Sequence, residues 1–252
     1  MALALVTGAS SGVGRATVLA LRARGWEVLA VARRAAHLED LASDCAAAIH
    51  PLDAADPKAV DALLESLRGR TPDLIVNAAG AGRWHRLEDT SPAEARAMMD
   101  APFFAAFLIA LAFLPGMLKR GSGQIIHVNS PAAYQPWPHS ALYAASRGAL
   151  RSLHEALRQD LAGSGVMSSH ITFGKVSSDY FLSNPGTEER LPKIAKTFRT
   201  LSPEDCATLI LRLIDRPKAE AIHPPLMAFY LTVWRVWPGL VRWIIRITSP
   251  RP

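Results

Sequence analysis

Three side chains in the middle of the chain have the types and spacing for proton transfer to a carbonyl oxygen. Tyr143 and Arg147 are four residues apart in a helix-length stretch, which would place both on one helix face. A tyrosine donates a proton near neutral pH only when a neighbouring cation stabilises its phenolate, and Arg147 would be that cation. Ser130 ends an apolar run and would hold the substrate oxygen by a hydrogen bond. The alternative is a core tyrosine with a satisfied hydroxyl and a helix-capping serine.

A glycine-rich turn near the start of the chain is the second candidate site. It follows the first apolar run and precedes an amphipathic stretch, so it would join a strand to a helix. Glycines at this spacing let the backbone approach a pyrophosphate, and the positive end of the following helix attracts its charge. We therefore predict that the turn binds the diphosphate of a dinucleotide, the alternative being a turn without a ligand. Its residues are Gly8, Ser10, Ser11, Gly12, Val13 and Gly14.

The end of the second apolar run indicates which nicotinamide dinucleotide fits. An acidic residue there would bond the ribose 2′-hydroxyl, whereas a cation would receive a 2′-phosphate. This run ends in Ala32, Arg33 and Arg34, with no acid among them. The sequence predicts Arg33 as the phosphate partner with Arg34 beside it, and NADP(H) as the cofactor. The alternative is that both arginines form a solvated helix start.

The elements that must position these residues alternate along the chain. Short apolar runs alternate with helix-length amphipathic stretches, which predicts a single Rossmann-type, doubly wound α/β domain over residues 1–223 with about seven parallel strands. Residues 177–200 have weaker periodicity and are expected to form a loop with short helices, of the kind that often closes over a substrate. Strands are expected at 3–6, 27–31, 47–50, 74–76, 124–129, 169–173 and 219–222, and helices at 12–24, 35–45, 57–67, 92–119, 140–161 and 203–214.

The composition argues against several other classes of protein. Half of the 252 residues are hydrophobic and the net charge is +6. The basic residues are scattered and no nucleic-acid module is recognisable, so no nucleic-acid partner is expected. Cys45 and Cys206 are far apart and lack metal-ligand spacing; we expect no metal, and two thiols in a reducing compartment. No signal peptide is recognisable, and we expect the domain to be cytoplasmic.

Several segments, in order, resemble the short-chain dehydrogenase/reductase family. Residues 7–14, TGASSGVG, are similar to its glycine fingerprint, and Ser130 lies thirteen residues before Tyr143, as in its catalytic pair. Residues 77–80, NAAG, and 173–178, FGKVSS, are similar to two further family segments. The resemblance covers residues 3–220 and implies an oxidoreductase that interconverts a carbonyl and an alcohol with Tyr143 as acid/base. The cofactor contacts that it implies are Asp53, Asn77, Ala78, Gly80, Tyr143, Arg147, Gly174, Val176 and Ser178.

Three positions depart from the family pattern. The family has lysine at Arg147, asparagine at Pro102 and proline at Phe173. A guanidinium keeps the positive charge but is effectively never deprotonated, so it cannot relay a proton as an ammonium does. Pro102 lacks an amide side chain and would kink its helix. Two alternatives to the oxidoreductase therefore stay open: an NADP(H)-binding regulator or scaffold with little or no redox turnover, and non-redox catalysis in the same pocket.

Aromatic residues on the predicted loops indicate the kind of substrate. The family places these loops around the substrate mouth, where aromatic side chains would cover an apolar or amphipathic small molecule. The alternative is that they only pack the lid. His139, on the loop before Tyr143, is a candidate substrate contact. The aromatic residues are Trp84, Tyr134, Trp137, Tyr180 and Phe181.

The pattern changes after Ile222, where residues 224–252 form an apolar and basic extension. Its arginines at 235, 242 and 246 are seven and four apart and would share one helix face. Residues 225–246 also carry three tryptophans and fit a helix in peripheral contact with a membrane. The alternative is a helix that covers the substrate cleft or a partner subunit. Residues 103–114 are apolar nearly all round, so we expect burial on both sides and a homodimer or homotetramer.

Overall fold

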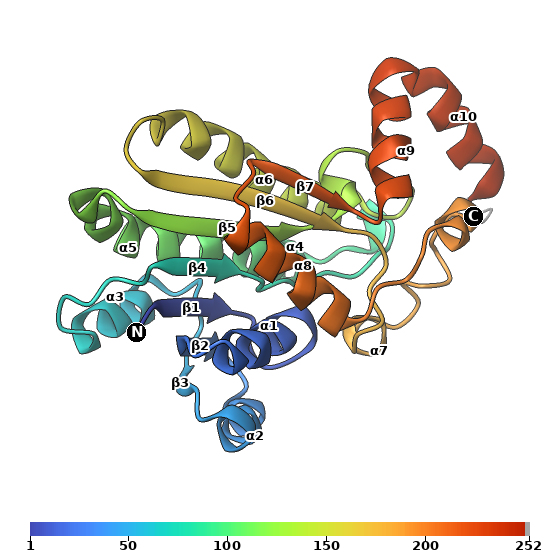
Figure 1. Cartoon of the computed structure of the whole chain (residues 1–252). Coiled ribbons are helices and arrows are strands. Elements are labelled where there is room, and N and C mark those ends of the chain that lie inside the picture. The colour runs from blue at the N-terminus through green and yellow to red at the C-terminus, as the bar shows by residue number, and fades with distance from the viewer. Residues whose placement is uncertain (250–252) are drawn as a thin grey trace.

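Seven parallel strands form the centre of the computed structural model, which describes residues 1–249 (Figure 1). The strands lie in the order β3-β2-β1-β4-β5-β6-β7, which confirms the predicted doubly wound fold. The order reverses between β1 and β4, and ligands of open α/β sheets bind outside the carboxyl ends of the strands at such a point. All predicted strands are present, with ends shifted by at most three residues. They are β1 Leu3–Thr7, β2 Glu27–Ala32, β3 Ala48–Pro51, β4 Leu74–Asn77, β5 Gly123–Asn129, β6 Val166–Phe173 and β7 Glu220–His223.

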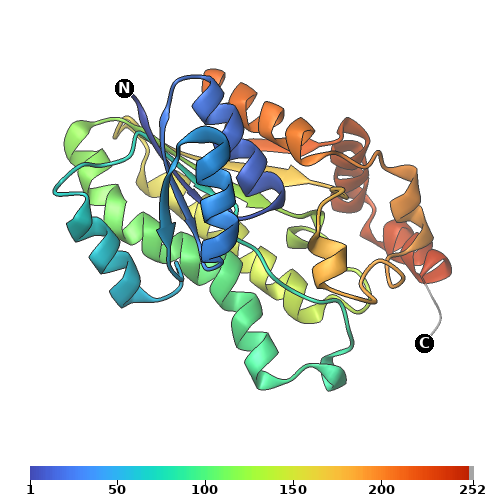
Figure 2. The ribbon, with the colours of Figure 1, turned by 90° about the horizontal axis from the view of Figure 1, so that it is seen from below.

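Helices cover both faces of the sheet, as the view from below shows (Figure 2). Because both faces are buried, β1, β2 and β4 are nearly continuous apolar runs, and all five residues of β1 are buried. One face packs against α1 Gly12–Ala23, α2 Ala35–Cys45 and α8 Pro203–Asp215. The other packs against α3 Pro57–Ser66, α5 Ala105–Arg120 and α6 Ala141–Asp160.

The helix predicted over residues 92–119 is interrupted. α4 Pro92–Met99 runs into a π-helical turn, Asp100–Phe104, before α5 begins. Pro102 is buried inside this turn. A proline has no N–H for the regular helix ladder and its ring crowds the preceding turn, which accounts for the wider turn at this point.

The apolar stretch around α5 has one packed side and one exposed side. By length and composition, the helical stretch Pro92–Arg120 is able to span a membrane, yet Ile109 and Phe113 pack into the core beneath the sheet. In the single chain only one side of residues 103–114 is buried, so burial on both sides through an oligomer stays a prediction. The exposed apolar side chains here are Phe104, Phe107, Leu111 and Leu118.

The C-terminal extension forms a helical hairpin beyond the edge of the sheet (Figure 1). α9 Pro225–Val236 follows β7 and packs against it, and α10 Pro238–Thr248 turns back toward Lys193–Thr197. The prediction that its three arginines share one helix face is wrong: the bend at Trp237 leaves one arginine on α9 and two on α10. Residues 250–252 of the predicted extension lie outside the described residues.

Candidate active site

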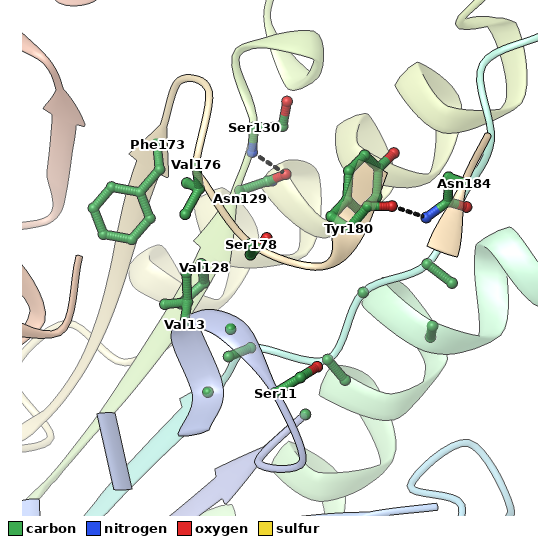
Figure 3. A pocket seen from close by; sticks show the side chains of 18 of the residues that line it. Ser11, Val13, Val128, Asn129, Ser130, Phe173, Val176, Ser178, Tyr180 and Asn184 are labelled. Carbon is green, nitrogen blue, oxygen red and sulfur yellow. Dashed lines mark hydrogen bonds between the residues drawn. The ribbon is translucent and has the colours of Figure 1, made fainter. Parts of the chain in front are cut away.

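A cavity of about 610 Å³ opens at the carboxyl ends of the strands (Figure 3). Figure 3 shows Ser11 and Val13 on the glycine turn, Ser130 at the end of β5, and Val176 and Ser178 on the segment after β6, all around this space. Except for Asn77, every residue predicted to bind cofactor or to act in catalysis lines the cavity. Asn77 is buried below it, where its amide nitrogen lies 3.3 Å from His127 Nδ1.

The glycine turn is closed so tightly that side chains are excluded from two of its positions. Gly8 has φ +67°, and a Cβ placed on it would lie 2.7 Å from the carbonyl oxygen of Ala78. A Cβ on Gly14 would lie 2.3 Å from the carbonyl oxygen of Gly8. The turn leads into α1, whose N-cap residue Ser11 makes no side-chain hydrogen bond to the helix. The N–H groups of the first turn of α1 thus keep their capacity to bind an anion at the positive helix end.

The two arginines after β2 have different neighbours. Arg34 lies across the glycine turn, and its guanidinium donates to Ser10 Oγ at 2.9 Å and to Ser11 Oγ at 2.6 Å. Arg33 lies 3.8 Å from an oxygen of Asp53, and its side chain is 67% exposed. All of these side chains line the cavity. They form a cationic rim beside the turn, in which Arg34, predicted to flank Arg33, is the arginine that contacts the turn.

The predicted catalytic residues meet at the other end of the cavity. Ser130 follows β5, and its Oγ accepts from the backbone N–H of Ala132 at 3.3 Å. The Tyr143 ring lies on α6, where it is almost entirely buried. One turn further along α6, the Arg147 guanidinium carbon lies 5.0 Å from the centre of that ring. A cation and a phenol thus share one helix face, as the four-residue spacing predicted.

Arg147 is buried next to the segment that follows β4. A Cβ on Gly80 would come within 2.5 Å of its Nη2, so the guanidinium fills the space that this glycine leaves. Within residues 1–249, its buried Nε has no hydrogen-bond partner. A buried guanidinium N–H without a partner is costly unless a ligand satisfies it. This orphaned donor and the glycine cradle fit a dinucleotide that spans the cavity.

Aromatic side chains form the mouth of the cavity. The Trp84 ring lies 5.7 Å from that of Tyr143 and 6.0 Å from that of Trp137, between ring centres. Tyr180 donates to the carbonyl oxygen of Gly82 at 2.6 Å, and burial beside Tyr143 raises the pKa of its hydroxyl. Trp84, Trp137, Tyr180 and Phe181 line the cavity as predicted.

Two other candidate substrate contacts, Tyr134 and His139, do not line the cavity. Tyr134 turns away because its hydroxyl bonds Glu220 on β7, and burial raises its pKa. His139 lies on the loop with a left-handed backbone, φ +62°.

The lid predicted over residues 177–200 is a loop with two short helices, α7 Tyr180–Ser183 and a 3-10 helix at Lys193–Thr197. Besides the hydrogen bond from Tyr180 to Gly82, two further hydrogen bonds join it to the Trp84 loop. Thr187 Oγ1 accepts from the backbone N–H of Trp84 at 3.3 Å, and Arg190 donates to the Trp84 carbonyl. The lid and the aromatic mouth therefore form one wall.

Sequence reasoning missed Asn129, which joins the two catalytic elements. Its Oδ1 accepts from the backbone N–H of Ser130 at 2.8 Å, and its Nδ2 donates to the carbonyl oxygen of Arg147 at 3.0 Å. The same Nδ2 lies 2.8 Å from His170 Nε2. The only available signal was an amide at the end of a strand, directly before the candidate serine.

The tautomer of His170 follows from these partners. An amide nitrogen only donates, so Nε2 accepts and the ring proton is on Nδ1, 3.2 Å from the hydroxyl of Tyr134. Tyr134 in turn donates to the carboxylate of Glu220. A chain of hydrogen bonds thus runs from β7 to Asn129 and holds the ends of β5 and α6 in register.

Three buried histidines behind the site make stability depend on pH. Burial, with the nearby His154, lowers the pKa of His127 to about 3, and burial with neighbouring cationic groups lowers that of His170 to about 2. Burial also lowers the pKa of His154. Between these values and about 6.5, the unfolded chain binds more protons than the folded chain, so stability falls as the pH falls.

Lowering the pH from about 7.5 to about 5 is expected to reduce the free energy of unfolding by about 2 kcal/mol for each of His127 and His170. Urea unfolding at the two pH values measures this difference. His127→Gln should remove the part of this pH dependence that His127 contributes, about 2 kcal/mol between the two pH values. Equal stability at the two pH values would contradict the lowered pKa values of His127 and His170.

Comparisons with known proteins agree with this geometry. The short chain dehydrogenase family profile matches residues 2–188. An uncharacterised short-chain type dehydrogenase/reductase of Sinorhizobium fredii is 31% identical over 216 residues, which are 85% of this chain and 86% of that protein.

Two solved structures are similar over most of the chain. A short-chain dehydrogenase from Streptomyces avermitilis has a TM-score of 0.80 at 26% identity and covers 96% of this chain and 98% of its own. The closed form of a serine dehydrogenase in complex with NADP+ has a TM-score of 0.80 at 26% identity, over 87% of this chain and 93% of its own. The fold, the cavity and these matches together place the chain in the short-chain dehydrogenase/reductase family of oxidoreductases.

Proposed function

We propose that the protein is an NADP(H)-dependent oxidoreductase that interconverts a carbonyl and an alcohol on an apolar or amphipathic small molecule. The observation that carries this proposal is the meeting of Ser130, Tyr143 and Arg147 in one cavity with the glycine turn. The similar serine dehydrogenase binds NADP+, which supports the choice of cofactor. Turnover of a carbonyl compound with consumption of NADPH is the direct test.

The chain's own residues carry the proton chemistry. Bound NADPH supplies a hydride. Ser130 Oγ orients the carbonyl oxygen, and the Tyr143 hydroxyl donates a proton to it. The Arg147 guanidinium stabilises the resulting phenolate by its charge but keeps its own protons, so Tyr143 regains its proton by another route.

The cationic rim beside the glycine turn supports NADP(H) over NAD(H). A 2′-phosphate between Arg33 and Arg34 would gain charge-assisted hydrogen bonds that a 2′-hydroxyl does not make. Asp53 lies within 3.8 Å of Arg33, so part of the rim's charge is balanced until a phosphate binds. Asp53 is assigned to the adenine side of the same pocket.

Replacing Arg33 and Arg34 together by alanine is expected to weaken NADPH binding about 10²- to 10⁴-fold, because two charged hydrogen bonds of about 1.5–3 kcal/mol each are lost. NADH affinity should change by less than about threefold by the same reasoning. Fluorescence titration with both nucleotides measures the ratio. Arg158→Ala with Arg216→Ala, two exposed arginines outside the cavity, is the matched control. Equal affinity of the unmodified protein for NADH and NADPH would contradict the proposed preference for NADP(H).

A second candidate function is an NADP(H)-binding protein with little or no redox turnover. Arg147 stands where the family has lysine, and Pro102, at the position of the family asparagine, is buried and does not line the cavity. Both changes affect proton relay and leave the nucleotide cradle intact. Nucleotide binding without turnover on any carbonyl compound would favour this candidate. Conversion of a substrate without change in NADPH would instead favour non-redox catalysis in the same pocket.

Features around the cavity support proposals for the substrate class, the oligomeric state and the location of the protein. The aromatic mouth formed by Trp84, Trp137 and Tyr180 supports an apolar or amphipathic substrate. The exposed apolar side of α5 supports a homodimer or homotetramer. We place the protein in the cytoplasm, with peripheral membrane contact through residues 225–246.

A further inference from the structure

The α9–α10 hairpin is apolar on both sides. Its inner side chains, among them Met227, Tyr230 and Ile245, pack together with Phe198 from the end of the lid. Its outer side chains are not covered by any of residues 1–249. The exposed apolar residues of the hairpin are Leu226, Phe229, Val236, Trp237, Leu240, Trp243 and Ile247.

The hairpin also concentrates positive charge. Residues 224–252 contain four arginines and no acidic residue, in a chain whose net charge is +6. Arg235, Arg242 and Arg246 are exposed, and none of the three forms an ion pair within the part of the chain that the structure describes. Arg242 lies over the ring of Trp234, with its guanidinium carbon 5.4 Å from the ring centre. The hairpin therefore combines exposed apolar side chains with three exposed cations that have no ion-pair partner among residues 1–249.

This pattern fits an anionic lipid surface better than a second copy of the chain. Two copies that met through this surface would bring their arginines together without an acid to pair them, which costs energy. Tryptophan and arginine side chains next to exposed aliphatic ones are typical of segments that lie at the headgroup boundary. α9 has 12 residues and α10 has 11, whereas a spanning helix needs about 20, so each helix is too short to cross a membrane.

The inner side of the hairpin forms part of the active-site wall. Met227 on α9 and Phe198 on the lid both line the cavity, and the rings of Phe198 and Tyr230 are 5.4 Å apart between centres. In both ribbon views the hairpin lies beside the lid, with α10 next to Lys193–Thr197 (Figures 1 and 2). A surface that contacts the outer side of α9 is thus one helix thickness from the cavity.

We propose that the α9–α10 hairpin docks the protein on an anionic phospholipid surface, and that the substrate is an amphipathic carbonyl compound dissolved in that membrane. The substrate part rests on the proposed oxidoreductase function, whereas the docking part does not. Docking places the aromatic mouth and the lid at the membrane, where a long apolar substrate is concentrated and where water is scarce.

Flotation of the full chain with vesicles tests the docking. The protein is expected to float with vesicles of phosphatidylcholine and phosphatidylglycerol and to remain in solution with phosphatidylcholine alone. Replacing Arg235, Arg242 and Arg246 together by glutamine should weaken binding about a hundredfold, since each cation near an anionic surface contributes about a factor of five. Trp237→Ala with Trp243→Ala should weaken it as well. NADPH titration shows that each variant is folded.

A matched control removes three exposed cations elsewhere, with Lys58, Arg96 and Lys119 replaced by glutamine. This variant should bind anionic vesicles nearly as well as the unmodified protein. Equal losses in the two triple variants, or equal binding to both kinds of vesicle, would overturn the docking. So would a change from dimer to monomer in the tryptophan variant without lipid binding by the unmodified protein.

The same preparations separate the two proposals. Flotation with anionic vesicles but no oxidation of NADPH by any carbonyl compound supports docking and overturns the proposed function. Reduction of soluble ketones without flotation leaves the proposed function and overturns docking. If both hold, a long-chain ketone presented in anionic vesicles should be reduced at least about tenfold faster by the unmodified protein than by the triple arginine variant, a ratio equivalent to about 1.4 kcal/mol.

Discussion

Tyr143→Phe is expected to lower carbonyl turnover by about 10²- to 10⁴-fold while NADPH binding stays within about threefold of the unmodified protein. The phenylalanine ring would keep its place between Trp84 and Arg147, because both residues contact the ring of Tyr143 and not its hydroxyl. Only the hydroxyl that donates the proton is lost. The decrease in NADPH absorbance across a panel of ketones gives the rate, and fluorescence titration gives the affinity.

Tyr230→Phe is the matched control for this result. Tyr230 is buried in the hairpin outside the cavity, and within residues 1–249 its hydroxyl has no hydrogen-bond partner. Its removal should leave the rate unchanged and the stability equal or slightly higher. Full turnover by Tyr143→Phe would show that another group donates the proton. Absence of turnover in the unmodified protein, with NADPH bound, would select the non-redox or regulatory alternatives.

Gly14→Ala is expected to weaken NADPH binding more than about a hundredfold, which corresponds to about 3 kcal/mol. The new methyl group would lie 2.3 Å from the carbonyl oxygen of Gly8. That carbonyl has little room to retreat, because Gly8 itself is packed against the backbone of Ala78. The turn must therefore open, and its N–H groups move away from the position of the diphosphate. Fluorescence titration measures the loss of NADPH affinity, and urea unfolding measures the effect of the opened turn on stability.

Gly148→Ala on α6 is the matched control, because Gly148 is not part of the turn that binds the diphosphate. A Cβ there meets no atom within 4 Å, and alanine in a helix interior is favoured over glycine by about 1 kcal/mol. This variant should bind NADPH normally and be slightly more stable. Normal NADPH affinity in Gly14→Ala would mean that the diphosphate is bound elsewhere.

Much of the fold was predictable because of its buried parallel sheet. Strands covered on both faces are often apolar at nearly every position, so β1, β2 and β4 were visible as short apolar runs between longer amphipathic stretches. The residues that line the cavity were predictable for a similar reason. They follow the carboxyl ends of strands, which all meet at one edge of the sheet.

What was not predictable depends on contacts between distant segments. Tyr134 follows a strand like a substrate contact, but its hydroxyl bonds Glu220, 86 residues away in sequence. Arg34 lies across the glycine turn because Ser10 and Ser11 accept its hydrogen bonds. The hairpin bend at Trp237 has a local signal in Pro238, but the packing of α10 against Lys193–Thr197 joins segments far apart in sequence. In each case a partner far along the chain selects the orientation.

The division of the cavity into two walls has a consequence for how new specificities arise. The back wall, which carries Ser130 and Tyr143, is anchored through Asn129 to the strands of the sheet. The front wall is made of the Trp84 loop, the lid and α9; a hydrogen bond joins the lid to the Trp84 loop, and Phe198 joins the lid to α9. Mutations that reshape the front wall therefore leave the reacting groups in place, so substrate range can diversify by drift or laboratory selection without loss of chemistry.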